Sequence, residues 1–97
     1  MSRVRITPTE LAVLDGAATG RLWHSDAGHD LYASYLDSHS GVRRRKVSAV
    51  VDRLCDREIP LLAIGEADRF RRLWYLTEEG NRVRNAAIMS AGGSGVQ

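Results

Sequence analysis

The chain has 97 residues, of which 43% are hydrophobic and 27% are charged, and its net charge is +2. Two cores would leave each half near the size at which chains need disulfides or metals to fold, so we expect one domain. The single cysteine, Cys55, excludes an internal disulfide. No segment approaches the roughly 20 apolar residues of a membrane helix, and the first residues lack the apolar run of a secretory signal. We therefore expect a cytoplasmic protein that does not span a membrane.

Two basic clusters stand out from a chain that is otherwise close to neutral. Residues 41–57 hold six basic and two acidic side chains, whereas residues 1–40 are mildly acidic and residues 58–97 are balanced. The second cluster consists of three arginines within four positions, Arg69, Arg71 and Arg72. Because the total charge is small, the position of these clusters in the fold is more informative than the sum.

The first helix is predicted over residues 8–18. The run Thr7-Pro8-Thr9-Glu10 has the form of a capping box with proline at the first helical position, where its missing N–H costs nothing. The apolar residues that follow recur along one side of the helix. Gly20 is placed to stop it.

The segment between residues 21 and 41 is less regular. Residues 21–24 predict a brief strand. Over residues 29–36, apolar pairs four positions apart favour a helix, although residues 31–33 can also pair back on the preceding strand as a hairpin. We predict a helix here, and a cluster of turn residues at 37–41 ends it.

The strongest periodic signal lies between residues 42 and 57. Apolar side chains at positions 47, 50, 51, 54 and 55 recur at helical spacing and predict a helix that ends near Arg57. Residues 59–64 and 72–76 then predict two strands that are joined by a long polar loop.

The last helix is predicted to begin at Thr77. This residue is a suitable cap, and Glu78 and Glu79 in the first turn suit the helix dipole. We expect the helix to fade by about Met89. Residues 90–97 have no apolar periodicity and predict a disordered tail, so the domain is expected to cover residues 1–89.

This order of elements resembles that of winged helix-turn-helix domains. A recognition helix is suggested by residues 43–54, RRRKVSAVVDRL. Residues 74–80, WYLTEEG, are similar to the aromatic-x-Leu-Thr-x-x-Gly that closes the wing in bacterial regulators of the multiple-antibiotic-resistance and phenolic-acid-repressor kinds. The chain also looks like small stand-alone winged-helix proteins of actinobacterial and actinophage genomes, over about residues 8–89.

The resemblance implies an α+β fold with three to four helices, a small antiparallel sheet and a wing hairpin. It also implies a sequence-specific DNA-binding protein that acts as a transcriptional regulator or a phage-encoded controller. If residues 29–37 form a strand, the strict helix-turn-helix is lost, while the basic helix and the wing remain.

The basic start of the helix predicted over 42–57 is the main indication of function. Cations in the first turn of a helix are unfavourable by about 0.3–1 kcal/mol each, so four of them suggest an anionic partner. With the apolar stripe turned inward, we expect Arg45, Lys46, Ser48 and Ala49 to enter a major groove of DNA. Arg43 and Arg44 would bind phosphates. An arginine-rich, solvated helix is the alternative.

The predicted loop between residues 65 and 71 fits a wing that follows the DNA backbone or reaches a minor groove. An ordinary charged hairpin tip is the alternative. Arg3 and Arg5 resemble a basic arm, but we expect them to be solvent-exposed. The residues expected to contact DNA are Arg43, Arg44, Arg45, Lys46, Ser48, Ala49, Arg53, Arg69, Arg71 and Arg72.

The aromatic residues and the cysteine are expected to be structural. We place Trp23, Trp74 and Tyr75 in the core and the sheet, where alternation sends Trp74 and Tyr75 to opposite faces, and not on a platform that stacks single-stranded bases. Cys55 is expected to be a small buried side chain of the basic helix.

The sequence shows no pattern typical of an enzyme. The histidines His24, His29 and His39 lack metal-ligand spacing, so we expect no metal site, no cofactor and no catalysis. The expected partner is double-stranded DNA. Because the total charge is small, the alternative is an acidic host protein that binds the same basic surface. Long flanking helices typical of many winged-helix dimers are absent, so we expect a monomer or a weak homodimer.

Overall fold

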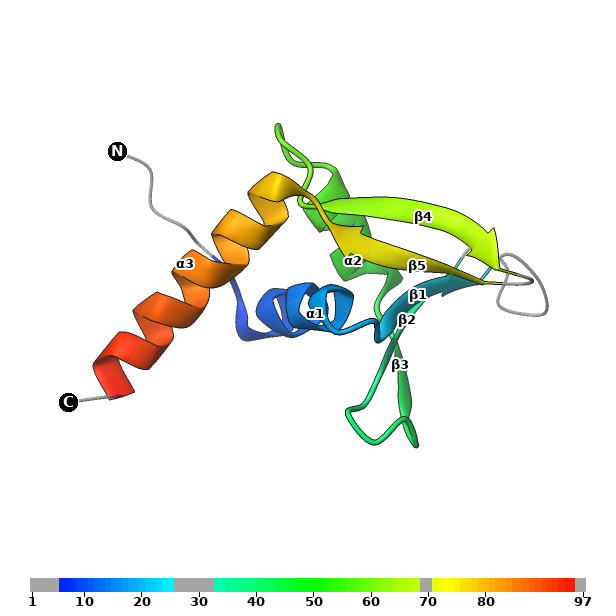
Figure 1. Cartoon of the computed structure of the whole chain (residues 1–97), viewed down its shortest axis with the longest axis horizontal. Helices are drawn as coiled ribbons and strands as arrows, with labels where there is room; N and C mark the ends of the chain where they lie inside the picture. Colours follow the sequence, from blue (N-terminus) through cyan, green and yellow to red (C-terminus); the bar gives the residue numbers. More distant parts are fainter. Residues whose placement is uncertain (1–5, 26–32, 69–70, 96–97) are drawn as a thin grey trace.

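The computed structural model describes residues 6–25, 33–68 and 71–95. In chain order its elements are α1 (Pro8–Ala18), β1 (Leu22–Ser25), β2 (Ser34–Asp37), β3 (Arg44–Lys46), α2 (Ser48–Cys55), β4 (Leu62–Asp68), β5 (Arg71–Leu76) and α3 (Glu78–Gly95) (Figure 1). The strands form one antiparallel sheet in the order β3-β2-β1-β5-β4. Three helices and a five-stranded sheet in the described part confirm the predicted α+β class.

The two faces of the sheet carry different apolar clusters. Neighbouring residues of a strand point to opposite faces, so Leu22 and Trp23 of β1 belong to different clusters. The cluster of Leu22 includes side chains from all three helices, and we call its side of the sheet the inner face. The other cluster consists of Trp23, Ala33 and Tyr35 with Leu73 packed against them, and none of these belongs to a helix. We call this side the outer face.

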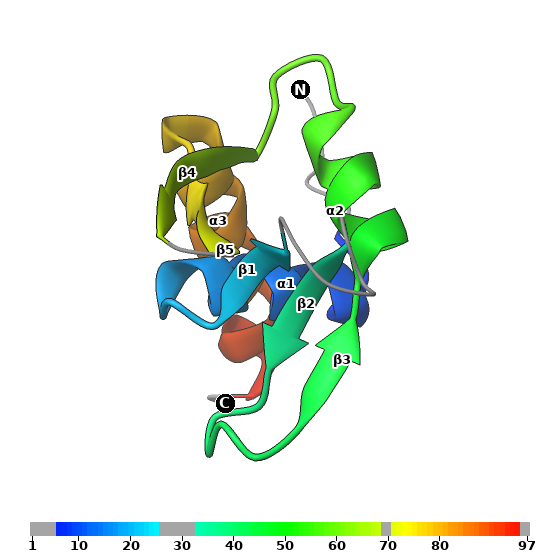
Figure 2. The ribbon, with the colours of Figure 1, turned by 90° about the vertical axis from the view of Figure 1, so that its right-hand side faces the viewer.

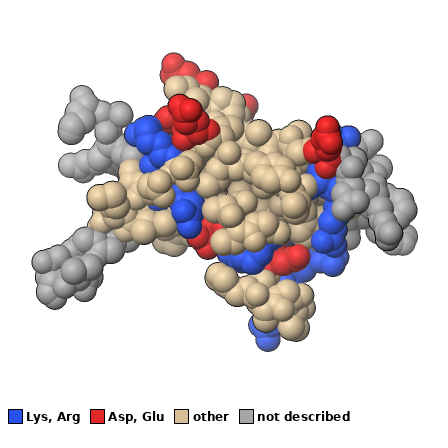
Figure 3. Space-filling view, in the orientation of Figure 1, with Lys and Arg blue, Asp and Glu red and all other residues tan. Residues whose placement is uncertain are grey.

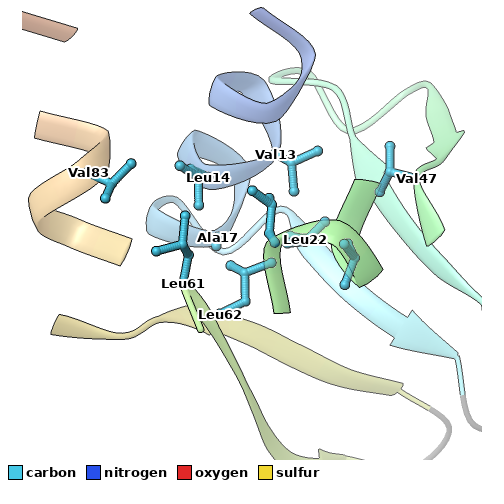
Figure 4. Packing of buried hydrophobic residues seen from close by; sticks show 10 residues of the cluster. Val13, Leu14, Ala17, Leu22, Val47, Leu61, Leu62 and Val83 are labelled. Atoms are coloured by element: carbon cyan, nitrogen blue, oxygen red, sulfur yellow. The ribbon is translucent and has the colours of Figure 1, made fainter. Parts of the chain in front are cut away.

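The inner cluster is the main core of the molecule. Its buried members are Val13, Leu14, Ala17, Leu22, Val47, Val51, Leu54, Leu61, Leu62 and Val83 (Figure 4). A fully buried valine or leucine side chain contributes about 1.5–3 kcal/mol relative to an exposed one. Because the members come from α1, α2, α3 and the strands, this burial fixes the three helices against the inner face.

The predicted first helix is confirmed with both of its ends. Thr7 Oγ1 accepts from the backbone N–H of Glu10 at 3.1 Å, and the carboxylate of Glu10 accepts from the backbone N–H of Thr7 at 3.0 Å, so the capping box is complete. Gly20 follows the C-cap with φ of +75°, a conformation that side chains with a Cβ rarely adopt. The sequence predicts α1 well because both of its termini are fixed by local chemistry.

The helix predicted over residues 29–36 is wrong in its described part. Residues 26–32 lie outside the described residues, but Ser34–Asp37 form β2, which pairs with β1. The hairpin that we considered as the alternative is formed in a different register, with Tyr35 opposite Trp23 and Leu36 opposite Leu22. A strand places Tyr35 on the outer face and Leu36 against the main core, and this burial outweighs the local helical pairs.

The predicted basic helix is also wrong at its start. Residues Arg44–Lys46 form the edge strand β3, paired with β2, and α2 begins only at Ser48. Val47 is the N-cap, and its backbone N–H donates to the carbonyl of Ser34 at 2.8 Å, which ties the end of β3 to β2. Figure 2 shows β3 at one edge of the sheet, with α2 rising from its end. The helical periodicity therefore belongs to the segment after Lys46.

The C-terminal half follows the prediction, but its elements are longer. The strand predicted over 72–76 is confirmed as β5. The strand predicted over 59–64 is wrong at both ends, because β4 begins only at Leu62 and reaches into the predicted loop as far as Asp68. The predicted end of the last helix near Met89 is wrong, because α3 continues to Gly95, through most of the expected tail. Extending a helix needs only one more residue to be ordered for each added hydrogen bond, but Gly92 and Gly93 are poor helix formers, and nothing in the structure explains why the helix continues through them. No helix in the described part is long and apolar enough to cross a membrane.

Candidate nucleic-acid interface

The first basic cluster forms the free edge of the sheet. Arg43 ends the turn between β2 and β3, and Arg44, Arg45 and Lys46 make up β3 itself. All four side chains are exposed. Arg44 and Lys46 are opposite Asp37 and Tyr35, on the outer face, whereas Arg45 is opposite Leu36 and points to the inner side. We call Arg43, Arg44, Arg45 and Lys46 the ribbon cations.

The turn that presents the ribbon cations is held by short-range hydrogen bonds. The backbone N–H of Arg43 donates to Ser38 Oγ at 3.1 Å, and that of Ser38 donates to the carbonyl of Arg43 at 2.8 Å. Gly41 has φ of +78°, which a residue with a Cβ rarely adopts. The β2–β3 hairpin is therefore a defined two-stranded ribbon and not a loose loop.

In the described part of the chain, the protein's own carboxylates do not neutralise the ribbon cations. Within the described part of the chain, none of the four has a carboxylate at ion-pair distance. The nearby Arg21 differs, since its Nη2 lies 3.2 Å from Asp15 Oδ2 and its Nη1 donates to the carbonyl of Asp37 at 2.7 Å. Beside Arg21, a hollow of about 320 Å³ is lined by Arg43, Arg44 and Arg45. Positive charge at this edge is thus available to a ligand.

The second basic cluster approaches the first on the outer face. Arg71 at the start of β5 lies opposite Ser25, and its Cζ is 4.0 Å from the centre of the Trp23 ring. The Cζ of Arg44 is 4.9 Å from the same ring and 5.6 Å from that of Tyr35. Arg69 lies outside the described residues. Figure 3 shows basic side chains gathered at the right-hand end of the molecule, where β1 and β5 lie in Figure 1.

Two other residues that we expected to contact DNA lie elsewhere. Arg72 is next to Arg71 in β5 and so points to the inner side, where it lines a hollow of about 440 Å³ together with Ser48 of α2. Ser48 Oγ accepts from the backbone N–H of Ser34 at 2.9 Å, which fastens α2 to β2. Ser34 Oγ in turn accepts from Trp74 Nε1 at 3.1 Å. The hydroxyl of Ser48 is therefore engaged in a structural contact.

The exposed surface of α2 is not basic. Its exposed residues are Ala49, Asp52 and Arg53. Arg53 Nε lies 3.7 Å from Glu10 Oε2, so this cation has an acidic neighbour on α1. A carboxylate such as that of Asp52 repels a DNA phosphate. The expected recognition helix is therefore corrected: Arg45 and Lys46 lie on β3, and only Ala49 of the groove-facing set is exposed on a helix.

The aromatic residues and the cysteine lie largely where they were expected. Trp23 and Tyr35 are buried, with ring centres 5.0 Å apart, and Trp74 packs against the main core. Tyr75 is more than half exposed in the sheet. Cys55 is half-buried on α2, and its burial, helped by Asp52 and Asp56, raises the pKa of the thiol.

The sequence did not predict the association of Arg44 and Arg71 with Trp23. Only the pairing of β1 with both β2 and β5 brings these three side chains together, and no local pattern reports that pairing. Among the described residues, no group of three or more His, Cys, Asp or Glu could hold a metal ion. Comparison of the chain with protein-family models, curated proteins and solved structures finds no match.

Proposed function

We propose that this protein binds double-stranded DNA through the β2–β3 ribbon, with Arg71 as a second contact point. One observation carries the proposal: four consecutive cations project from a sheet edge without a carboxylate partner in the described part of the chain. Like charges crowded in this way repel one another, and a polyanion removes that repulsion. Neutralising DNA phosphates also releases counterions, which favours binding.

The geometry of the ribbon suits a duplex. A major groove is about 12 Å wide and admits a two-stranded β-ribbon as well as a helix. Alternation along β3 sends Arg45 to one side of the ribbon and Arg44 and Lys46 to the other. A ribbon in the groove can therefore contact a base edge on one side and the phosphate backbone on the other. This arrangement supports a base contact by Arg45 and phosphate contacts by its neighbours.

The order of the elements supports a modified winged helix. In this interpretation β1, β5 and β4 are the usual small sheet, the β4–β5 hairpin is the wing, and α1, α2 and α3 are the surrounding helices. The β2–β3 hairpin then replaces the first helix of the helix-turn-helix. The basic residues lie on this hairpin and not on α2, so the ribbon takes over the DNA contact, as in a sequence-specific regulator of transcription.

Binding to duplexes at several salt concentrations tests the proposal. With four to six phosphate contacts, log K should fall with log salt with a slope of about −0.9 per contact. Selection from random duplexes should then recover a preferred sequence. The control is Arg82→Gln, which removes one positive charge from the ion pair with Glu79 on α3. Phosphate contacts are strong at low salt, on the order of 50 mM. If the protein binds no duplex at that concentration, the proposal is overturned. Preferential binding to an acidic polypeptide supports a protein partner instead.

A further inference from the structure

We propose that Arg44 and Arg71 bind one and the same phosphate group, over the indole ring of Trp23. The inference rests on the proposed DNA binding and adds to it a defined binding site for a single backbone phosphodiester. It joins two residues from the two basic clusters of the sequence, on β3 and on β5. The sequence alone gives no indication that these two residues act together.

Both guanidinium groups are held in place by the same ring. Their Cζ atoms lie 4.9 and 4.0 Å from its centre, at the distance of a cation–π contact. The ring itself is rigid, because Trp23 is only 5% exposed and lies against Tyr35. A guanidinium group is planar, and its N–H donors match the oxygens of a phosphate when it is held in one orientation. Because both Cζ atoms lie close to one ring centre, they are no more than about 9 Å apart, within the span that one phosphate can bridge.

The free protein leaves this pair electrostatically unsatisfied. Both arginines are exposed, and neither has a carboxylate at ion-pair distance in the part of the chain that the structure describes. Two positive charges beside one ring repel each other, and attraction to the ring opposes this repulsion. One phosphate placed between them is attracted by both charges. The two cations therefore favour an anion at this position, with Asp37 opposite Arg44 as the acidic neighbour that the anion competes with.

Trp23 has an unmet hydrogen bond of its own. In the described part of the chain, its Nε1 and the Nε of Arg84 are the buried side-chain nitrogens without an acceptor. A buried donor without an acceptor is unfavourable. This N–H is closed to solvent in the free protein, so it senses a phosphate at the arginines through the packing of the ring and not by direct contact. The other indole differs, because Trp74 Nε1 already donates to Ser34 Oγ at 3.1 Å. The two tryptophans thus form a built-in comparison between a responsive and an unresponsive N–H.

The first test asks whether the two arginines share a phosphate. We compare duplex binding by Arg44→Gln, Arg71→Gln and the double variant over a salt series. Each phosphate lost should make the slope of log K against log salt less steep by about 0.9. A shared phosphate predicts that the double variant loses about one such step and that the two losses of affinity are not additive. Two separate phosphates predict two steps and additive losses, which overturns the inference while DNA binding stands.

The second test observes the indole N–H groups by NMR in the ¹⁵N-labelled full chain. Trp23→Phe and Trp74→Phe assign the two signals, and a duplex or inorganic pyrophosphate is then added. We expect the Trp23 signal to move and the Trp74 signal to stay, and we expect the movement to disappear in the Arg44→Gln/Arg71→Gln variant. Arg53→Gln/Arg57→Gln, which also removes two positive charges, is the charge-matched control, and thermal unfolding verifies that each variant is folded.

The outcomes separate the two proposals. If a duplex binds without moving the indole N–H signal of Trp23, the shared phosphate site is overturned and the proposed DNA binding stands. Pyrophosphate that moves the signal in a protein that binds no duplex overturns the proposed function and assigns the site to a free phosphate ion. A signal that neither probe moves, in a protein that binds no duplex, overturns both.

Discussion

Two residues explain why the motif at 74–80 marks the junction between β5 and α3. Thr77 Oγ1 accepts from the backbone N–H of Gly80 at 2.9 Å and donates to the carbonyl of Pro60 at 2.7 Å. Gly80 is buried against the chain at Leu61, where a Cβ would lie 2.0 Å from the carbonyl oxygen. The threonine thus caps α3 and fastens it to the segment before β4, and the glycine permits the close approach. The sequence predicted the cap, but the approach needs the fold.

The close approach at Gly80 predicts a loss of stability in Gly80→Ala. Overpacking of this kind costs about 1–3 kcal/mol, and a backbone carbonyl cannot move aside as a flexible side chain can. Urea unfolding of the variant measures the cost. Without the contact, alanine would raise stability by about 1 kcal/mol through its helix propensity. A stabilised variant therefore contradicts the packing. Asn81→Ala, at the exposed next position, is the control and should change stability by less than about 0.5 kcal/mol.

The ion pairs of Asp15 predict a contribution to the free energy of unfolding that is lost in acid. The hydrogen bond from Arg84, 2.6 Å from Asp15 Oδ1, lowers the pKa of this carboxyl, and the charges of Arg84, Arg21 and His39 add to the effect against partial burial. Since the folded pKa is below the unfolded one, the stabilisation is complete above the unfolded pKa and is lost as pH falls through the folded pKa.

Urea unfolding between about pH 5 and pH 2 tests this linkage, because that window spans the unfolded pKa near 3.8 and lower values. We expect the free energy of unfolding of the wild type to fall in this window, and that of Asp15→Asn to fall less steeply. Arg84→Gln removes the largest cause of the shift and should also flatten the curve. If the free energy of unfolding falls equally steeply with pH in Asp15→Asn and in the wild type, Asp15 is not the source of the acid-sensitive contribution.

At the scale of elements, the sequence predicted the segments whose ends have local signals. The capping box of α1, the cap of α3 and the apolar second half of β5 are examples. The edge strand β3 has no such signal. Arginine and lysine are good helix formers, and no glycine or proline separates Arg43 from Val47, so the basic run was added to the helix that follows.

One observation argued against that helix. Four cations at a helix N-terminus are electrostatically unfavourable, and we attributed this to a ligand. The structure removes the conflict instead, because Arg44–Lys46 pair with β2 and the helix begins after them. When the charges of a segment conflict with the dipole of a predicted helix, the first conclusion to test is therefore that the segment is not helical. A functional explanation comes second. The available positive charge nevertheless remains, now on a strand.

Matched charge removals distinguish the ribbon from α2. Arg43→Gln/Arg45→Gln removes two cations from the β2–β3 ribbon, and Arg53→Gln/Arg57→Gln removes two from the end of α2 and the residues after it. We expect the ribbon variant to bind duplex DNA at least about tenfold more weakly, the equivalent of one lost charge-assisted hydrogen bond. The α2 variant should bind nearly as the wild type does. Anisotropy titrations at one salt concentration suffice, and the reverse order of effects would return the interface to α2.

At the scale of the whole molecule, the sheet order creates the basic surface. The clusters at 43–46 and 69–72 are far apart in sequence, but β1 lies between β2 and β5 in the sheet and carries Trp23 between them. Sheet order depends on non-local pairing, which the periodicity of single segments does not report. The two clusters were therefore visible in the sequence, while the meeting of Arg44 and Arg71 on the outer face was not. The same order keeps α2 on the inner side, so the molecule has two distinct faces to test.

The only cysteine reports which of these faces meets DNA. Cys55 lies at the end of α2 away from β3, and its raised pKa keeps it mostly as a slowly reacting thiol. If the ribbon binds the DNA as proposed, a saturating duplex should leave the rate of Cys55 modification by a maleimide unchanged. Ser40→Cys in a Cys55→Ser background places the thiol in the ribbon turn, and there the duplex should slow the reaction. Protection of Cys55 without protection of Cys at position 40 would place the DNA on α2 and reject the ribbon as the interface.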